Sequence, residues 1–112
     1  MSSLRQNKVA RLLLKELGII FQQNGTDWFP NTMISVTVVR VSPDFSFAKV
    51  YLSVFGASEP KECVAAVNQS SKMIRGALGK KIKSQLRITP ELAFYLDDSL
   101  DYAEALDEAL KS

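Results

Sequence analysis

The segment spanning residues 72–84 combines cations with glycines in a pattern typical of one helix. One arc of that helix carries, at positions i, i+3, i+4, i+7 and i+11, Lys72, Arg75, Gly76, Gly79 and Lys83, with Lys80 at its edge. Because glycine has no Cβ atom, another backbone can approach closely, and the flanking cations neutralise its negative charge. A phosphodiester chain fits this description better than a protein does. The alternative is that the glycines only relieve crowding or mark a frayed turn.

A second row of cations precedes this segment in the chain. In a helix predicted over residues 4–23, the cations gather opposite the apolar side; they are Arg5, Lys8, Arg11 and Lys15. Lys49, in a predicted strand, and Arg87, after the basic helix, complete the candidate set for RNA binding. Each row alone also matches a solvated helix face. Two rows on one small chain favour a nucleic-acid partner.

The chain offers little for catalysis or metal binding. It has no histidine, which excludes nucleophiles activated by histidine and the commonest metal ligand. Cys63 is the only cysteine, so it can form neither an internal disulfide nor a cysteine cluster. The adjacent carboxylates Asp97 and Asp98 would point to opposite faces of a strand. We therefore expect no catalytic residue, no metal site and no cofactor.

The composition predicts one ordinary globular domain over residues 1–112. The net charge is only +2, but residues 1–90 hold 13 Lys/Arg against 5 Asp/Glu and residues 91–112 hold 1 against 7. A basic body with an acidic end suggests a polyanionic partner for one face. No apolar run approaches the ~18 residues of a membrane span, and the first residues lack the apolar core of a signal peptide. With a single cysteine, the expected location is the cytoplasm.

The periodicity of the apolar residues predicts the order of the elements. A helix over residues 4–23 ends at Asn24-Gly25, and a loop follows it. Strands over residues 32–42 and 45–55 form an antiparallel hairpin around Pro43-Asp44. In the second strand, alternate residues from Ala48 to Val54 face the core, and Phe47, Lys49, Tyr51 and Ser53 face away.

The second half of the chain is predicted to be mainly helical. A helix over residues 60–69, preceded by Ser58 as a cap, breaks at Ser70-Ser71 because short hydroxyl side chains compete for backbone hydrogen bonds. The basic helix over residues 72–84 follows and should bury Met73, Ile74, Ala77, Leu78 and Ile82. A strand over residues 91–97 and an acidic helix over residues 100–110 complete the order.

Several stretches of the sequence resemble the ribosome-binding factor A family. The most specific lie between residues 74 and 100: Ile74-Arg75, Leu78-Gly79-Lys80, Leu86-Arg87, Pro90-Glu91-Leu92, Phe94 and Asp97-Asp98-Ser99-Leu100. The hairpin segments Val41-Ser42-Pro43-Asp44 and Ala48-Lys49-Val50-Tyr51 are also similar to a signature of that family.

The resemblance implies an α+β, KH-like fold of the type II order. That order is α-β-β-α-kink-α-β with an added C-terminal helix, and the helices pack on one face of a three-stranded sheet. The family's kink corresponds to Ser70, Ser71 and Lys72 here. The resemblance also implies a non-catalytic factor that binds the immature 30S ribosomal subunit and its 16S rRNA. Such a factor supports late maturation, precursor rRNA processing and cold adaptation.

Further expectations concern partners and alternatives. We expect a monomer with no membrane contact, for which ribosomal proteins are additional partners. One alternative is a KH-like RNA-binding domain that acts outside the ribosome, although its Gly-x-x-Gly spacing, Gly76 to Gly79, lies inside a helix. Another is a protein-interaction domain whose acidic last helix binds a basic partner.

Overall fold

The computed structural model describes residues 4–28, 32–56 and 59–97. Within them, the elements follow the order α1 (Leu4–Trp28), β1 (Met33–Val41), β2 (Phe47–Phe55), α2 (Pro60–Gln69), α3 (Ser71–Ile82) and β3 (Glu91–Leu96). This is the predicted order. The proposed cap at Ser58 and the predicted helix over residues 100–110 lie outside the described residues.

Helix α1 is longer than predicted. Asn24-Gly25 was expected to end it, yet the helix continues to Trp28. The Nδ2 of Asn24 donates to the carbonyl of Ile20, 3.1 Å away, so this side chain bonds back along the helix. Asn24 therefore lies within α1 and is not its last residue. The predicted loop is correspondingly shorter.

The three strands form one mixed sheet with β2 in the middle. Strands β1 and β2 pair antiparallel as predicted, with a register shift between Val36 and Val38 that leaves Thr37 as an extra residue. Strand β3 pairs parallel with β2, in a register that sets Val50 beside Phe94. A parallel neighbour requires a crossover connection, which α2 and α3 supply.

The hairpin turn delays the start of β2. The second strand was predicted from Phe45, but Phe45 has φ 61° and β2 begins at Phe47. A positive φ is incompatible with a strand and uncommon for a bulky side chain. The Ser42 carbonyl accepts from the Phe45 N–H, at 3.0 Å, and closes the turn.

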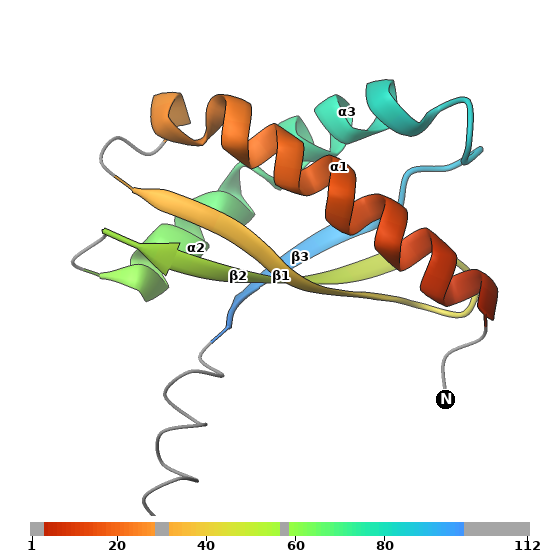
Figure 1. Ribbon diagram of the computed structural model, residues 1–112, viewed down its shortest axis with the longest axis horizontal. Coiled ribbons are helices and arrows are strands. Elements are labelled where there is room, and N and C mark those ends of the chain that lie inside the picture. Colours follow the sequence, from red (N-terminus) through yellow and green to blue (C-terminus); the bar gives the residue numbers. More distant parts are fainter. Residues whose placement is uncertain (1–3, 29–31, 57–58, 98–112) are drawn as a thin grey trace, which may run out of the picture.

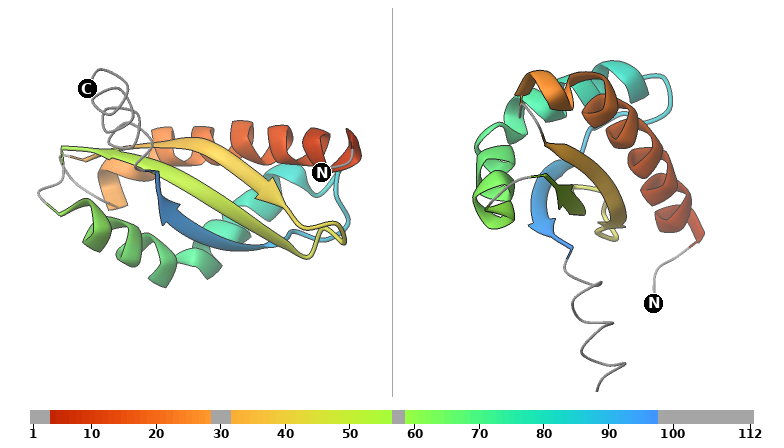
Figure 2. Two further views of the ribbon diagram at one scale, coloured as in Figure 1. Left: turned by 90° about the horizontal axis from the view of Figure 1, so that it is seen from below. Right: turned by 60° about the vertical axis from the view of Figure 1, so that its left-hand side comes forward.

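All three helices pack on one face of the sheet, and the opposite face is free of the other described elements (Figure 1, Figure 2). The core lies between these layers. Its most deeply buried side chains come from every described element except β1; they are Leu13, Leu17, Ile20, Leu52, Val50, Val67, Ile74, Leu78, Ile82 and Phe94. The predicted alternation of β2 holds, since Ala48, Val50 and Leu52 are fully buried. The fold is thus an apolar sheet face covered by amphipathic helices.

A single residue separates α2 from α3. Ser70 has φ −97° and ψ 12°, its N–H donates to the carbonyls of Ala66 and Val67, and its carbonyl accepts from Ile74. Both helix ends are therefore satisfied through the backbone of Ser70, without a side-chain cap. Any L-residue can adopt these angles, so the break needs no glycine. Ser71 is the first residue of α3.

The side chain of Asn68 joins α2 to β3. Its Nδ2 donates to the carbonyl of Phe94 at 2.8 Å, and its Oδ1 accepts from the N–H of Phe94 at 2.8 Å. One amide thus satisfies both backbone groups of a residue in an edge strand.

One predicted core residue is exposed. Met73 was expected to face the sheet, but half of its surface is accessible, whereas Ile74, Leu78 and Ile82 are buried. The buried residues are four apart and form a narrow stripe, and Met73 falls outside it.

Candidate nucleic-acid interface

Helix α3 presents a row of cations on the surface opposite its buried stripe. Lys72, Gly76, Lys80 and Lys83 are exposed, and Lys83 follows the last helical residue directly. The helical period separates them from Ile74, Leu78 and Ile82, which anchor α3 to the sheet. The arc predicted from the sequence therefore exists, and the core packing of α3 directs it outward.

Arg75 has a different position from its neighbours. It is half-buried, and its Nε and Nη2 both donate to the carbonyl of Thr89, at 3.0 and 2.7 Å. Thr89 belongs to the linker between α3 and β3. Arg75 was predicted to contact phosphate; in the structure its guanidinium holds this linker against the helix.

The two glycines of α3 also differ. A Cβ atom added to Gly76 would have no neighbour within 4 Å, whereas one added to Gly79 would lie 2.9 Å from Oγ1 of Thr89. The close approach that Gly79 permits is therefore made by the protein's own linker. Gly76 alone leaves open surface above the helix. Lys72, Arg75, Gly76, Gly79 and Thr89 line one hollow of about 470 Å³.

The cations of α1 share the helix layer with those of α3. Helix α1 packs against α3 and β1. Val9, Leu13 and Leu17 face the sheet, and the cations on the opposite side of α1 are exposed; they are Arg5, Lys8, Arg11 and Lys15. The outer surface of one layer thus carries both predicted rows of cations.

Lys49 lies on the other face of the molecule. It is exposed on β2 between the buried residues Ala48 and Val50, and therefore points away from the helices. It pairs across the hairpin with Arg40, which is also exposed and was not predicted as a site residue. The structure does not bring Lys49 together with the other candidates. Strand alternation could have shown this separation from the sequence.

The β1–β2 turn supplies polar groups in a segment that the sequence predicts only as a turn. Asp44 accepts hydrogen bonds from the hydroxyls of Ser46 and Ser42, both at 2.7 Å, and from the N–H of Ser46 at 3.1 Å. These bonds, with the Ser46 hydroxyl contributing most, lower the pKa of Asp44 from 3.8 to about 2. The carboxylate therefore remains ionised at neutral pH.

Arg5 and Arg87 flank this turn. The guanidinium carbon of Arg5 lies 5.3 Å from the centre of the Phe45 ring, within range of a cation–π interaction. Arg87, in the linker after α3, is exposed and lines the same hollow as Arg5 and Phe45. This cluster could not be found from sequence spacing, because its members come from three distant segments.

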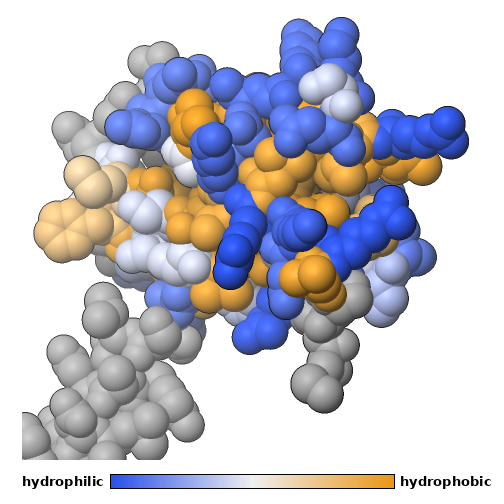
Figure 3. All heavy atoms as spheres, turned by 45° about the vertical axis from the view of Figure 1, so that its right-hand side comes forward, coloured by the Kyte–Doolittle hydropathy of each residue, from blue (hydrophilic) through white to orange (hydrophobic). Residues whose placement is uncertain are grey.

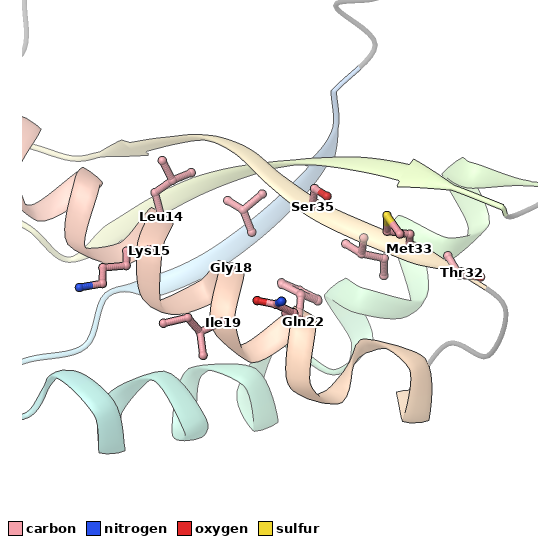
Figure 4. A pocket seen from close by; sticks show the side chains of 11 residues that line it. Leu14, Lys15, Gly18, Ile19, Gln22, Thr32, Met33 and Ser35 are labelled. Carbon is pink, nitrogen blue, oxygen red and sulfur yellow. The ribbon is translucent and has the colours of Figure 1, made fainter.

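A more apolar hollow of about 600 Å³ lies between α1 and β1. Figure 4 shows Leu14, Gly18 and Ile19 on the helix and Met33 on the strand among its lining residues. Lys15 also lines it, so this cation lies beside an apolar surface. The hollow offers no cluster of cations for a phosphate backbone.

The described residues show no constellation suited to metal binding, since no three His, Cys, Asp or Glu side chains gather there. Burial raises the pKa of the half-buried Cys63 thiol, which disfavours the reactive thiolate. No helix within the described ranges is long and apolar enough to span a bilayer.

Comparison with known proteins identifies the family. The family model of ribosome-binding factor A matches residues 5–110. The chain belongs to the ribosome-binding factor A family. A ribosome-binding factor A from Cytophaga hutchinsonii is 46% identical over 110 residues, which cover 98% of this chain and 83% of that protein.

Solved structures of ribosome-binding factor A confirm the fold. The crystal structure of the protein from Thermus thermophilus superposes with a TM-score of 0.68 at 23% identity, covering 81% of this chain and 94% of that one. A homology model of the Thermus thermophilus factor was fitted into the cryo-EM map of its complex with 30S. It superposes with a TM-score of 0.62 at 23% identity, covering 77% of this chain and 88% of that one. The predicted α+β, KH-like fold is therefore correct for the described elements.

Proposed function

We propose that this protein is a non-catalytic assembly factor that binds the immature 30S ribosomal subunit and its 16S rRNA. It supports late maturation of the subunit and processing of precursor rRNA. Membership of the ribosome-binding factor A family supports this proposal, as does the similarity to a factor fitted into a 30S complex. The protein acts as a monomer in the cytoplasm, and residues 1–112 fold as one domain.

The observation that carries the proposal is the cationic outer surface of the helix layer. Lys8 and Arg11 on α1, with Lys72, Lys80 and Lys83 on and after α3, are all exposed there. A row of cations without an apolar cleft suits a phosphate backbone, which is bound by neutralisation and release of counterions. The exposed Gly76 lets the backbone approach α3 closely.

Arg75 and Gly79 have indirect roles in this interface. Arg75 fixes the linker at Thr89, and Gly79 makes room for it. They thereby hold the linker that carries Arg87, two residues before Thr89, against α3. Lys15 contributes at the margin of the interface, where it borders the apolar hollow.

The proposal is tested by co-sedimentation with immature 30S particles. Charge reversal of three exposed cations, Lys72→Glu, Lys80→Glu and Lys83→Glu, should reduce the bound fraction at least about tenfold, and binding of the unmodified protein should weaken steeply with salt. Lys61→Glu, on the exposed surface of α2, reverses one charge outside the rows of α1 and α3 and should retain binding. Equal sedimentation of the triple variant and the unmodified protein would reject this surface.

A second measurement addresses maturation. In cells that lack the protein, the unmodified chain should restore processing of precursor 16S rRNA, and the triple variant should not. If the triple variant restores processing fully, subunit maturation does not depend on this cationic surface.

A further inference from the structure

Three segments that are distant in sequence enclose a hollow of about 450 Å³ at one end of the molecule. They are the beginning of α1, the β1–β2 turn and the linker between α3 and β3, and the wall residues that matter here are Arg5, Val9, Asp44, Phe45, Arg87 and Ile88. Figure 3 views the molecule with this end turned forward and shows apolar surface framed by long hydrophilic side chains. A mixed surface of this kind suits a ligand that has both apolar and charged parts.

The apolar part of the hollow is unusually accessible. Ile88 exposes 69% of its surface, although isoleucine is among the residues most often buried. Val9 and Phe45 belong to the core or pack against it, so their lining surface is fixed in place. A flat, weakly polar group could bury against these side chains without moving the backbone.

The β1–β2 turn positions one cation of the hollow, Arg5. Phe45 keeps a positive φ of 61°, a conformation that bulky residues rarely adopt and that persists only where surrounding contacts enforce it. Here the Asp44–serine bonds and the packed ring enforce it, and the ring in turn lies under the guanidinium of Arg5. Arg5 therefore offers a positioned cation whose other side can meet a base or a phosphate.

Asp44 contributes a free acceptor. The three hydrogen bonds from Ser42 and Ser46 all reach Oδ1, and Oδ2 has no hydrogen-bond partner among the described residues. A carboxylate oxygen between two arginines would repel an anion placed on it. It would instead accept from an N–H group of a ligand whose negative charge lies a few ångströms away, at the arginines.

We propose that this hollow binds one unpaired nucleotide of the rRNA. The base lies against Ile88 and the positioned Arg5, its phosphates contact Arg87 and Arg5, and Asp44 Oδ2 accepts from an N–H of the base. Guanine fits best because its N1–H and N2–H donors are adjacent. The amino groups of adenine and cytosine each lie beside a ring-nitrogen acceptor, and uracil presents one N–H between two carbonyls. The inference rests on the proposed function and adds a base-reading site to it.

The position of the hollow favours RNA over a peptide. The linker contributes Arg87 and Ile88 to this hollow, and its next residue, Thr89, lines the separate hollow on α3. The two hollows therefore adjoin. A phosphate backbone on the helix layer would therefore pass directly beside this hollow. This continuity with the cations of α3 is the reason to prefer a nucleic acid as the ligand.

The test measures the full chain against four single-stranded RNA pentamers, UUNUU with N as G, A, C or U, by fluorescence anisotropy at low salt. The guanine pentamer should bind about tenfold tighter than the all-uracil one, since stacking and a charged hydrogen bond each contribute to discrimination. Ile88→Asp should weaken binding of all four about tenfold. Because Ile88 is exposed, this change leaves the core intact.

Asp44→Asn tests the base reading, because it can keep an Oδ1 acceptor for the serines while it replaces Oδ2 by a donor; it should reduce the preference for guanine to about threefold or less. Glu62→Gln, which removes the charge of an exposed carboxylate on α2, is the matched control and should leave the preference unchanged. Equal affinity for all four pentamers, or unchanged binding by Ile88→Asp, would overturn the inference. If Ile88→Asp abolished 30S binding without any base preference in the unmodified protein, a protein partner would be indicated. If the unmodified protein shows no base preference and the Ile88→Asp variant still binds 30S particles, the nucleotide site is rejected. The proposed function would not be affected by that result.

Discussion

At the scale of single residues, two glycines three positions apart on one helix have different reasons to be there. Both were predicted to leave room for a phosphate backbone. In the structure only Gly76 faces open space, whereas Gly79 faces the hydroxyl of Thr89. A missing Cβ atom does leave room at both positions, but the sequence could not show that the chain itself supplies one of the approaching groups.

This difference predicts opposite behaviour of two matched substitutions. Gly76→Ala should raise the free energy of unfolding by up to about 1 kcal/mol, because alanine favours the helix and nothing obstructs its methyl group. Gly79→Ala should gain less or lose stability, because the new Cβ meets Thr89 Oγ1 at 2.9 Å. Chemical denaturation measures both.

Thr89→Ala provides the control for the glycine prediction. In that background the hydroxyl is absent, so Gly79→Ala should approach the gain of Gly76→Ala. An equal gain for both glycine variants in the unmodified protein would contradict the proposed clash.

At the scale of elements, the sequence predicted the order of helices and strands because each has a clear apolar period. The β2 alternation from Ala48 to Leu52 is an example. The break at Ser70 was predicted instead from the serine side chains, although the structure forms it through the backbone of Ser70. The end of α1 was predicted wrongly, since Asn24 bonds within the helix. The start of β2 was missed because the positive φ of Phe45 depends on bonds around Asp44. Hydrogen bonds of this kind leave no periodic pattern in the sequence.

The linker between α3 and β3 depends on a contact that the sequence does not reveal. Arg75 donates two hydrogen bonds to the carbonyl of Thr89. Arg75→Lys retains the charge but loses the fork geometry of the guanidinium. We expect it to lower the free energy of unfolding by about 1–2 kcal/mol. The exposed neighbour Lys72→Arg should have little effect, and equal stability of the two variants would exclude a structural role for Arg75.

At the scale of the whole molecule, the cations divide between two faces. The helix layer carries those of α1 and α3, and the open sheet face carries Lys49 and Arg40. The candidate site was therefore predictable as a set of residues but only partly as a surface. Summed charge cannot assign cations to faces, whereas packing of the helices on one side of β2 does.

Charge reversal on the two faces should therefore have unequal effects. Lys8→Glu with Arg11→Glu should weaken co-sedimentation with 30S particles about tenfold or more, because two phosphate contacts are lost. Lys49→Glu with Arg40→Glu changes the net charge equally and should weaken it far less. The reverse order of effects would move the interface to the sheet. Circular dichroism of both variants checks that the fold is retained.

The amide of Asn68 has a consequence for the protein at high concentration. By occupying the N–H and carbonyl of Phe94, it removes two of the backbone groups through which a neighbouring copy could extend the sheet beyond β3. A second copy would have to displace this amide to pair along the middle of that edge. The contact therefore disfavours growth of intermolecular β-structure there.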